Sequence, residues 1–163
     1  MALSIILVLA WLLILGLARR QFFHIALLGF PGVVLHELMH LVVGVVLLAK
    51  PTSMNLIPRR QGNAWLFGSV SFAGLNTFNA APVAYAPLLL LGVAWLLFYH
   101  WMLPLFDAQH YLIWIVSGYV IGCAIFYSAP SITDMKVGGW STVFWGVVVT
   151  GGWWLWTQSG YIH

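Results

Sequence analysis

The sequence predicts an all-α polytopic membrane protein with about five transmembrane helices and a small β-hairpin between the second and the third. Of the 163 residues, 63% are hydrophobic and only 6% are charged, whereas an ordinary soluble domain has roughly 25% charged residues. The apolar residues also form long runs separated by short polar segments, which is typical of a multi-pass membrane protein. We therefore expect a single membrane-embedded domain over residues 1–163.

Each apolar run is close to the roughly 20 residues that a helix needs to cross a bilayer. The five candidate spans are residues 2–18, 22–49, 80–104, 111–128 and 140–157. The second run contains Phe30-Pro31-Gly32, so we expect it to kink there or to begin its spanning part at Pro31. Basic residues flank the runs, which is a topology signal and predicts no nucleic-acid partner. The expected location is a prokaryotic cell (inner) membrane, in contact with the lipid bilayer.

The segment between the second and third runs is too polar for a helix through lipid. Residues 54–57 and 65–72 are typical of short strands, and Gln61-Gly62-Asn63 between them is typical of a turn. We therefore expect a hairpin within residues 54–72. An open strand edge cannot face lipid, so this hairpin should lie at the membrane interface or against protein.

The strongest chemical signal lies within the second apolar run, in His36-Glu37-Leu38-Met39-His40. Glu37 is the only glutamate of the chain, and a carboxylate inside an apolar helix costs a few kcal/mol. His36 and His40 are four residues apart and share one helix face, so both rings can ligate one zinc ion. Glu37 lies beside the first ligand, where it can take a proton from the water that attacks a peptide carbonyl. The pattern predicts a zinc metalloendopeptidase with Zn²⁺ as its cofactor.

A catalytic zinc usually has three protein ligands and one open position. Asp134 is the best candidate for the third ligand, because it follows a break at Ala129-Pro130 and lies, on alternating topology, near the C-terminal end of the second helix. The alternative for Asp134 is helix capping, since Ser131-x-x-Asp134 also fits the start of the fifth helix. The alternative for the whole chain is a non-catalytic metal-binding, transport or assembly protein of the membrane, in which the three residues serve binding alone.

These features resemble the site-2 protease family of intramembrane zinc metalloproteases, over roughly residues 22–136. The resemblance implies that His36, His40 and Asp134 bind zinc and that Glu37 is the general base. It implies hydrolysis of a peptide bond within or beside a transmembrane segment of a membrane-protein or membrane-peptide substrate. It also implies that the substrate unwinds and pairs as a strand beside the hairpin, for which residues 65–72 are the candidate edge.

Two asparagines ahead of the third apolar run are candidate substrate-binding residues in the same comparison. Asn76 and Asn79 lie in the segment Asn76-Thr77-Phe78-Asn79, where their amides could contact a peptide. The alternative is that one of them caps the third helix, since asparagine is a favoured N-cap residue.

Overall fold

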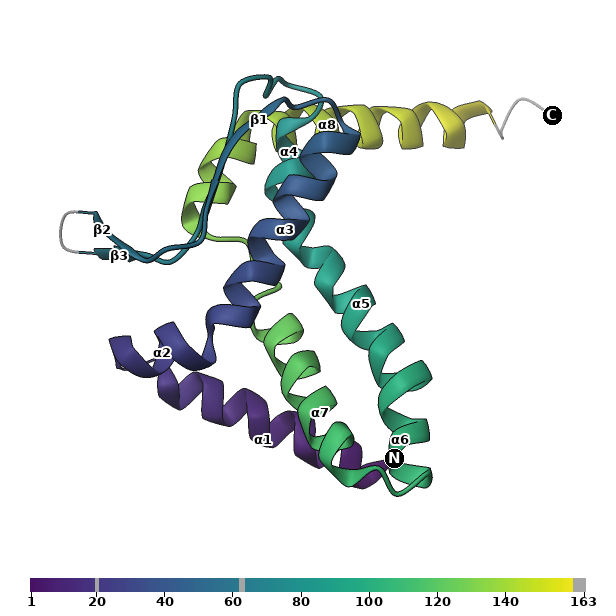
Figure 1. Cartoon of the computed structure of the whole chain (residues 1–163). Helices are drawn as coiled ribbons and strands as arrows, with labels where there is room; N and C mark the ends of the chain where they lie inside the picture. Colours follow the sequence, from purple (N-terminus) through teal and green to yellow (C-terminus); the bar gives the residue numbers. More distant parts are fainter. Residues whose placement is uncertain (20, 62–63, 160–163) are drawn as a thin grey trace.

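The protein is mostly helical, with short strands inserted between α3 and α4 (Figure 1). The computed structural model describes residues 1–19, 21–61 and 64–159. The α-helices are α1 (Ala2–Ala18), α2 (Phe22–Leu28), α3 (Phe30–Val46), α4 (Ala80–Ala84), α5 (Leu89–Leu97), α6 (Leu103–Asp107), α7 (Tyr111–Phe126) and α8 (Ile132–Ser159). The strands are β1 (Pro51–Asn55), β2 (Arg59–Gln61), β3 (Ala64–Leu66) and β4 (Ser69–Phe72). Two further helical segments flank α5, a 3₁₀ turn at Ala86–Leu88 and a π-helical turn at Phe98–Met102.

The prediction of about five transmembrane helices is wrong. Among the described residues, one continuous helix, Ala86–Asp107 with 22 residues, is long and apolar enough to cross a membrane. The helices α1, α3 and α7 are apolar but have only 17, 17 and 16 residues, below the roughly 20 that a span needs. The expected multi-pass location in a prokaryotic inner membrane is wrong for the same reason, since residues 1–19, 21–61 and 64–159 contain no multi-pass topology.

The chain breaks inside two of the predicted spans, and only the second of these breaks leaves a helix long enough to span. The run 22–49 divides into α2 and α3 at Gly29, two residues before Pro31, as the Phe30-Pro31-Gly32 sequence suggested. The run 80–104 divides at Tyr85, which ends α4 before the longer helix begins. The run 140–157 lies within α8, which is long, but its glycine, serine, threonine and tryptophan residues keep its hydropathy below the level of a span.

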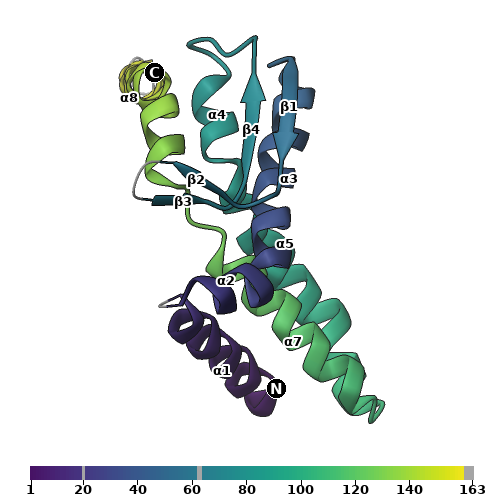
Figure 2. The ribbon, with the colours of Figure 1, turned by 60° about the vertical axis from the view of Figure 1, so that its left-hand side comes forward.

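A small core holds α1, α5 and α7 together. Leu90, Met102 and Ile121 are fully buried and pack with Val8 and Ala94 in one cluster. Burying each of the larger side chains stabilises the fold by about 1.5–3 kcal/mol. Figures 1 and 2 show these three helices below α3, so the core supports the N-terminal half of that helix.

The predicted hairpin is present and consists of two successive pairs of strands. β1 and β4 pair antiparallel with Asn55 opposite Ser69, and β2 and β3 continue the same arm with Arg59 opposite Leu66. Figure 1 shows the arm running along α3 and then away from it, with β2 and β3 at its tip. The expected Gln61-Gly62-Asn63 turn falls largely on residues 62–63, which lie outside the described part of the chain.

The helices leave many large apolar side chains exposed. On α8 these include Trp140, Trp145 and Trp153, and Figure 1 shows the C-terminal part of this helix extending away from the other elements. Its N-terminal part packs against α4, where Ser141 donates a hydrogen bond to the Thr77 carbonyl and accepts one from the Ala81 amide. These contacts fix the N-terminal part of α8 against α4.

Candidate metal centre

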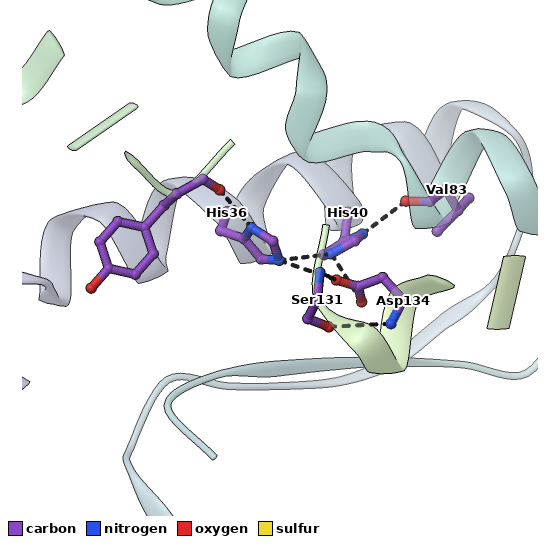
Figure 3. Close-up of polar contacts among 6 residues, drawn as sticks. His36, His40, Val83, Ser131 and Asp134 are labelled. Carbon is purple, nitrogen blue, oxygen red and sulfur yellow. Dashed lines mark hydrogen bonds and ion pairs between the residues drawn. The ribbon is translucent and has the colours of Figure 1, made fainter. Parts of the chain in front are cut away.

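Three side chains from two distant parts of the sequence meet at one point. His36 and His40 lie one turn apart on α3, and Asp134 lies in the first turn of α8. Figure 3 shows both imidazole rings directed at the Asp134 carboxylate. The three residues form a group that could hold a metal ion.

Backbone carbonyls fix the orientation of both histidine rings. His36 donates a hydrogen bond from Nδ1 to the Tyr127 carbonyl, and His40 donates one from Nδ1 to the Val83 carbonyl, each over 2.8 Å. A carbonyl can only accept, so the proton of each neutral ring lies on Nδ1 and its Nε2 atom carries a free lone pair. Outer contacts of this kind are typical of histidines that ligate metals.

The free lone pairs converge. The two Nε2 atoms are 3.2 Å apart, and each lies 3.4 Å from an oxygen of Asp134, Oδ2 for His36 and Oδ1 for His40. Acceptors this close repel one another unless a positive charge lies among them. The arrangement therefore requires either a shared proton or a bound cation.

The pKa values of the group reflect this crowding. Burial on its own would lower the pKa of His36, but its hydrogen bonds to Asp134 and the Tyr127 carbonyl outweigh that effect and raise the pKa. Burial would likewise raise the pKa of Asp134, but contacts with His36, His40 and Ser131 hold it far below its usual range. Asp134 is therefore present as a carboxylate, the form that binds metals.

Asp134 also caps α8, as the alternative interpretation of the sequence expected. The Ser131 amide donates a hydrogen bond to Asp134 Oδ2 over 2.6 Å, and the Asp134 amide donates one to Ser131 Oγ over 3.2 Å. This reciprocal pair is a capping box. Capping and proximity to the histidines are compatible, because the carboxylate uses different lone pairs for the two sets of partners.

Glu37 lies beside the three residues, buried under the hairpin arm. Burial raises its pKa, while the neighbouring His36 and His40 act in the opposite direction. Within the described part of the chain no hydrogen bond to its carboxylate is found, and Glu37 lines the same cavity as the two histidines. An otherwise unoccupied carboxylate with a raised pKa, next to a group that can bind a metal, is suited to accept a proton from water.

The approach of the hairpin to Glu37 depends on Gly68. A Cβ atom on Gly68 would lie 2.7 Å from both Cγ and Oε1 of Glu37, and 2.9 Å from Cγ1 of Val33. Ordinary contacts of a Cβ atom lie at 3.4–4 Å, so only glycine allows this approach. A glycine within a strand segment is a sequence signal for close backbone contact, but it does not identify Glu37 as the partner.

A cavity of about 1190 Å³ opens at the site. α3 lines it with the two histidines and Glu37, and β4 lines it together with its flanking residues. The loop from α7 to α8 and Arg19, next to the C-terminal end of α1, also line the cavity. The space exceeds the roughly 300–1,000 Å³ of a typical small-molecule site.

The two candidate substrate-binding asparagines do not line this cavity among the residues that the structure describes. Asn76 Oδ1 accepts hydrogen bonds from the amides of Phe78 and Asn79. Asn79 Oδ1 accepts one from the Asn76 amide, and its Nδ2 donates to the carbonyls of Leu47 and Gly74. These contacts connect the start of α4 to the end of α3. The two asparagines therefore have a structural role, and their contact with a substrate stays a prediction.

Two partners of the site had no sequence signal. Tyr127 and Val83 contribute through their backbone carbonyls, and any residue type can supply a carbonyl. No known family model matches the chain, and no curated protein or solved structure matches it either. The function therefore has to be argued from the site itself.

Proposed function

We propose that the protein is a zinc-dependent endopeptidase of the site-2 protease kind, which hydrolyses a peptide bond within or beside a transmembrane segment of another protein. The observation that carries the proposal is the convergence of three lone-pair donors, His36 Nε2, His40 Nε2 and an Asp134 oxygen, beside the buried carboxylate of Glu37.

Zinc suits the geometry of this group. Around a tetrahedral zinc ion with bonds of about 2.0–2.2 Å, neighbouring ligand atoms lie roughly 3.3–3.6 Å apart. The two Nε2 atoms are 3.2 Å apart, and each lies 3.4 Å from a different oxygen of Asp134. One ligand atom from each residue falls within 4.8 Å of the others, so a modest shift of the carboxylate would bring one oxygen to the third position. Two imidazoles and one carboxylate are also a typical donor set of catalytic zinc, and leave a fourth position for water or substrate.

Different residues of the chain would have different roles in hydrolysis. When bound, zinc lowers the pKa of a coordinated water towards about 7 and polarises the carbonyl that is attacked. Glu37 takes the proton of the attacking water and can return it to the leaving amine. His36 and His40 keep their orientation because their Nδ1 atoms stay bonded to backbone carbonyls.

An extended peptide fits the cavity better than a compact ligand does. β4 pairs with β1 on one side, and the residues of β4 line the same cavity as the histidines. A substrate strand could add to β4 and so present its carbonyls to the site, because helical carbonyls are occupied by hydrogen bonds. The apolar character of Val70 and Phe72 on this wall favours an apolar peptide segment.

Metal analysis of the purified protein tests the metal-binding part of the proposal. We expect about one zinc ion per chain in the parental protein and in Glu37→Gln, as one three-ligand site implies. Zinc content should fall in His36→Ala, His40→Ala and Asp134→Ala. Absence of zinc from the gently purified parental protein would refute the proposal.

Cleavage of a membrane-segment reporter tests catalysis. General-base catalysis contributes about 10²–10⁴-fold, so Glu37→Gln should lose at least 10²-fold in rate while keeping its zinc. Asp107→Asn is the matched control, because it also removes one carboxylate but lies at the end of α6. Full cleavage by Glu37→Gln would rule out Glu37 as the general base. No cleavage by the zinc-loaded parental protein would leave metal binding without catalysis, which is the alternative of a non-catalytic metal-binding protein.

A further inference from the structure

The cavity at the site contains a positive charge that the metal chemistry does not use. Arg19 follows the last residue of α1 and lines the same cavity as His36 and Glu37. Figure 1 shows the C-terminal end of α1 and the tip of the hairpin arm on the same side of α3. A substrate that occupies the cavity could therefore meet Arg19.

Among residues 1–19, 21–61 and 64–159, no anionic group pairs with this arginine, and its side chain forms no ion pair or hydrogen bond. The sequence has three acidic residues in all. Glu37 lines the same cavity but forms no ion pair with Arg19, and Asp134 is occupied by the two histidines and Ser131. Asp107 ends α6 at the opposite end of the long helix from the site.

Arg19 is exposed to solvent while it lines the cavity. Phe126, Tyr127 and Pro130 line the cavity with it, so its charge is available to a ligand that lies against these side chains. Burial raises the pKa of Tyr127 to about 12 while the Arg19 charge acts in the opposite direction, so the guanidinium lies within electrostatic range of this tyrosine. Tyr127 also provides the carbonyl that orients His36. The same residue therefore interacts with Arg19 and with the metal group.

We infer that Arg19 binds a carboxylate group of the substrate and so selects the peptide segments that the site accepts. This inference rests on the proposed peptidase function. A guanidinium presents a planar pair of N–H donors that matches the two oxygens of a carboxylate. The carboxylate comes either from the C-terminus of the peptide or from an acidic side chain near the cleaved bond, and both sources offer the same group.

One N-acetylated apolar octapeptide in three forms distinguishes the sources. The peptide contains one internal glutamine. The first form has a free C-terminal carboxylate, and the second has a C-terminal amide. The third form also has the C-terminal amide, but glutamate replaces the glutamine. Binding is measured by calorimetry with the zinc-loaded parental protein, Arg19→Gln, Arg19→Lys and Arg60→Gln. Arg60 is the matched control, since it is an exposed arginine on β2 that does not line the cavity.

We expect the parental protein to bind one carboxylate form about tenfold more tightly than the neutral amide, as a charge-assisted pair allows. Arg19→Gln should lose this preference, Arg19→Lys should keep part of it, and Arg60→Gln should keep all of it. The form that is preferred identifies the source of the carboxylate. Equal binding of all three forms by the parental protein would overturn the inference, and so would a preference that survives in Arg19→Gln, since it would then come from the metal.

The same peptides separate this inference from the proposed function. If the carboxylate preference depends on Arg19 but no form is cleaved, the peptidase function is wrong and the binding role of Arg19 stands. If cleavage occurs in the parental protein without any carboxylate preference, the peptidase function stands and the role of Arg19 is wrong. An Arg19→Gln protein that fails to fold leaves Arg19→Lys as the test, because it keeps the charge and removes the planar pair of donors.

Discussion

Replacing Gly68 with alanine should impair catalysis while leaving metal binding intact. The new Cβ atom would lie 2.7 Å from Cγ and Oε1 of Glu37, in a backbone conformation that alanine can adopt, since Gly68 has no positive φ angle. Glu37 has to move by about 0.7 Å to restore ordinary contact at 3.4 Å. Cγ1 of Val33, 2.9 Å from the new Cβ atom, has to shift as well. The carboxylate is the end of a flexible side chain and can move further than Val33, so we expect the position of the carboxylate to change most.

The size of the effect follows from how sharply catalysis depends on position. A displacement of about 1 Å in a reacting group can reduce the rate about 10²-fold. We therefore expect Gly68→Ala to lower kcat by about 10²-fold. The ligand residues His36, His40 and Asp134 have no contact with the new methyl group among its three nearest atoms, which belong to Glu37 and Val33. Zinc content should stay at about one ion per chain.

The assay combines reporter cleavage with metal analysis on three proteins. Gly92→Ala is the matched control, because a Cβ atom there meets no atom within 4 Å, and alanine in a helix interior should stabilise the protein by about 0.5–1 kcal/mol. The reasoning is refuted if Gly68→Ala cleaves at the parental rate. It is also refuted if Gly68→Ala loses activity and zinc together. The hairpin would then position the three metal-binding residues and not Glu37.

Two further predictions concern the third ligand and the core. Ser131→Ala removes the hydroxyl that accepts a hydrogen bond from the Asp134 amide. Loss of such an outer contact typically lowers metal affinity about 10–100-fold, and competition with a chelator should show this loss. Ser131→Thr keeps a hydroxyl and should retain most of the affinity. Unchanged affinity in Ser131→Ala would mean that the capping box does not position the ligand. Leu90→Ala empties a fully buried site and should lower the free energy of unfolding by about 2–5 kcal/mol, whereas Leu91→Ala, at 46% exposure, should lower it by much less. Equal losses in a denaturant titration would contradict the assignment of Leu90 to the core.

The two histidines could be predicted from sequence because their relation is local. Residues four apart share a helix face whatever the rest of the chain does, so His36 and His40 are neighbours once α3 forms. Asp134 is 94 residues further along than His40, and only the Ser131-x-x-Asp134 capping pattern marked its surroundings. The structure brings it to the histidines, because α8 starts beside α3.

The number of spans could not be predicted from composition, because hydrophobic residues mark a helix without fixing its length. The run 22–49 is 28 residues long, yet the chain breaks at Gly29 and leaves a 17-residue helix. Apolar side chains such as Leu13, Leu112 and Trp153 are exposed on their helices. Their abundance in the sequence therefore gave the same signal as continuous spans.

The role of Gly68 and the position of Arg19 were beyond sequence analysis for a different reason. Each depends on a contact between segments that pack only in the folded chain, the hairpin against α3 and the end of α1 against the cavity. No spacing rule connects Gly68 with Glu37 or Arg19 with His36. Both residues are nevertheless informative once the fold is known. The close approach requires glycine, and Arg19 lines the cavity without an anionic partner among the described residues.

The double role of Asp134 has a consequence for how the site responds to metal. Its carboxylate holds the first turn of α8 through Ser131 and faces His36 and His40 on α3. A cation bound there would attract the carboxylate towards α3 and would be stabilised in turn by the ordered capping box, because ligation and capping require the same placement of Asp134. Binding of metal and ordering of the α8 N-terminus are therefore coupled, and a ligand that favours one favours the other by the same free energy. Since α8 also holds α4 through Ser141, the carbonyl of Val83 on α4 that orients His40 belongs to the same coupled unit.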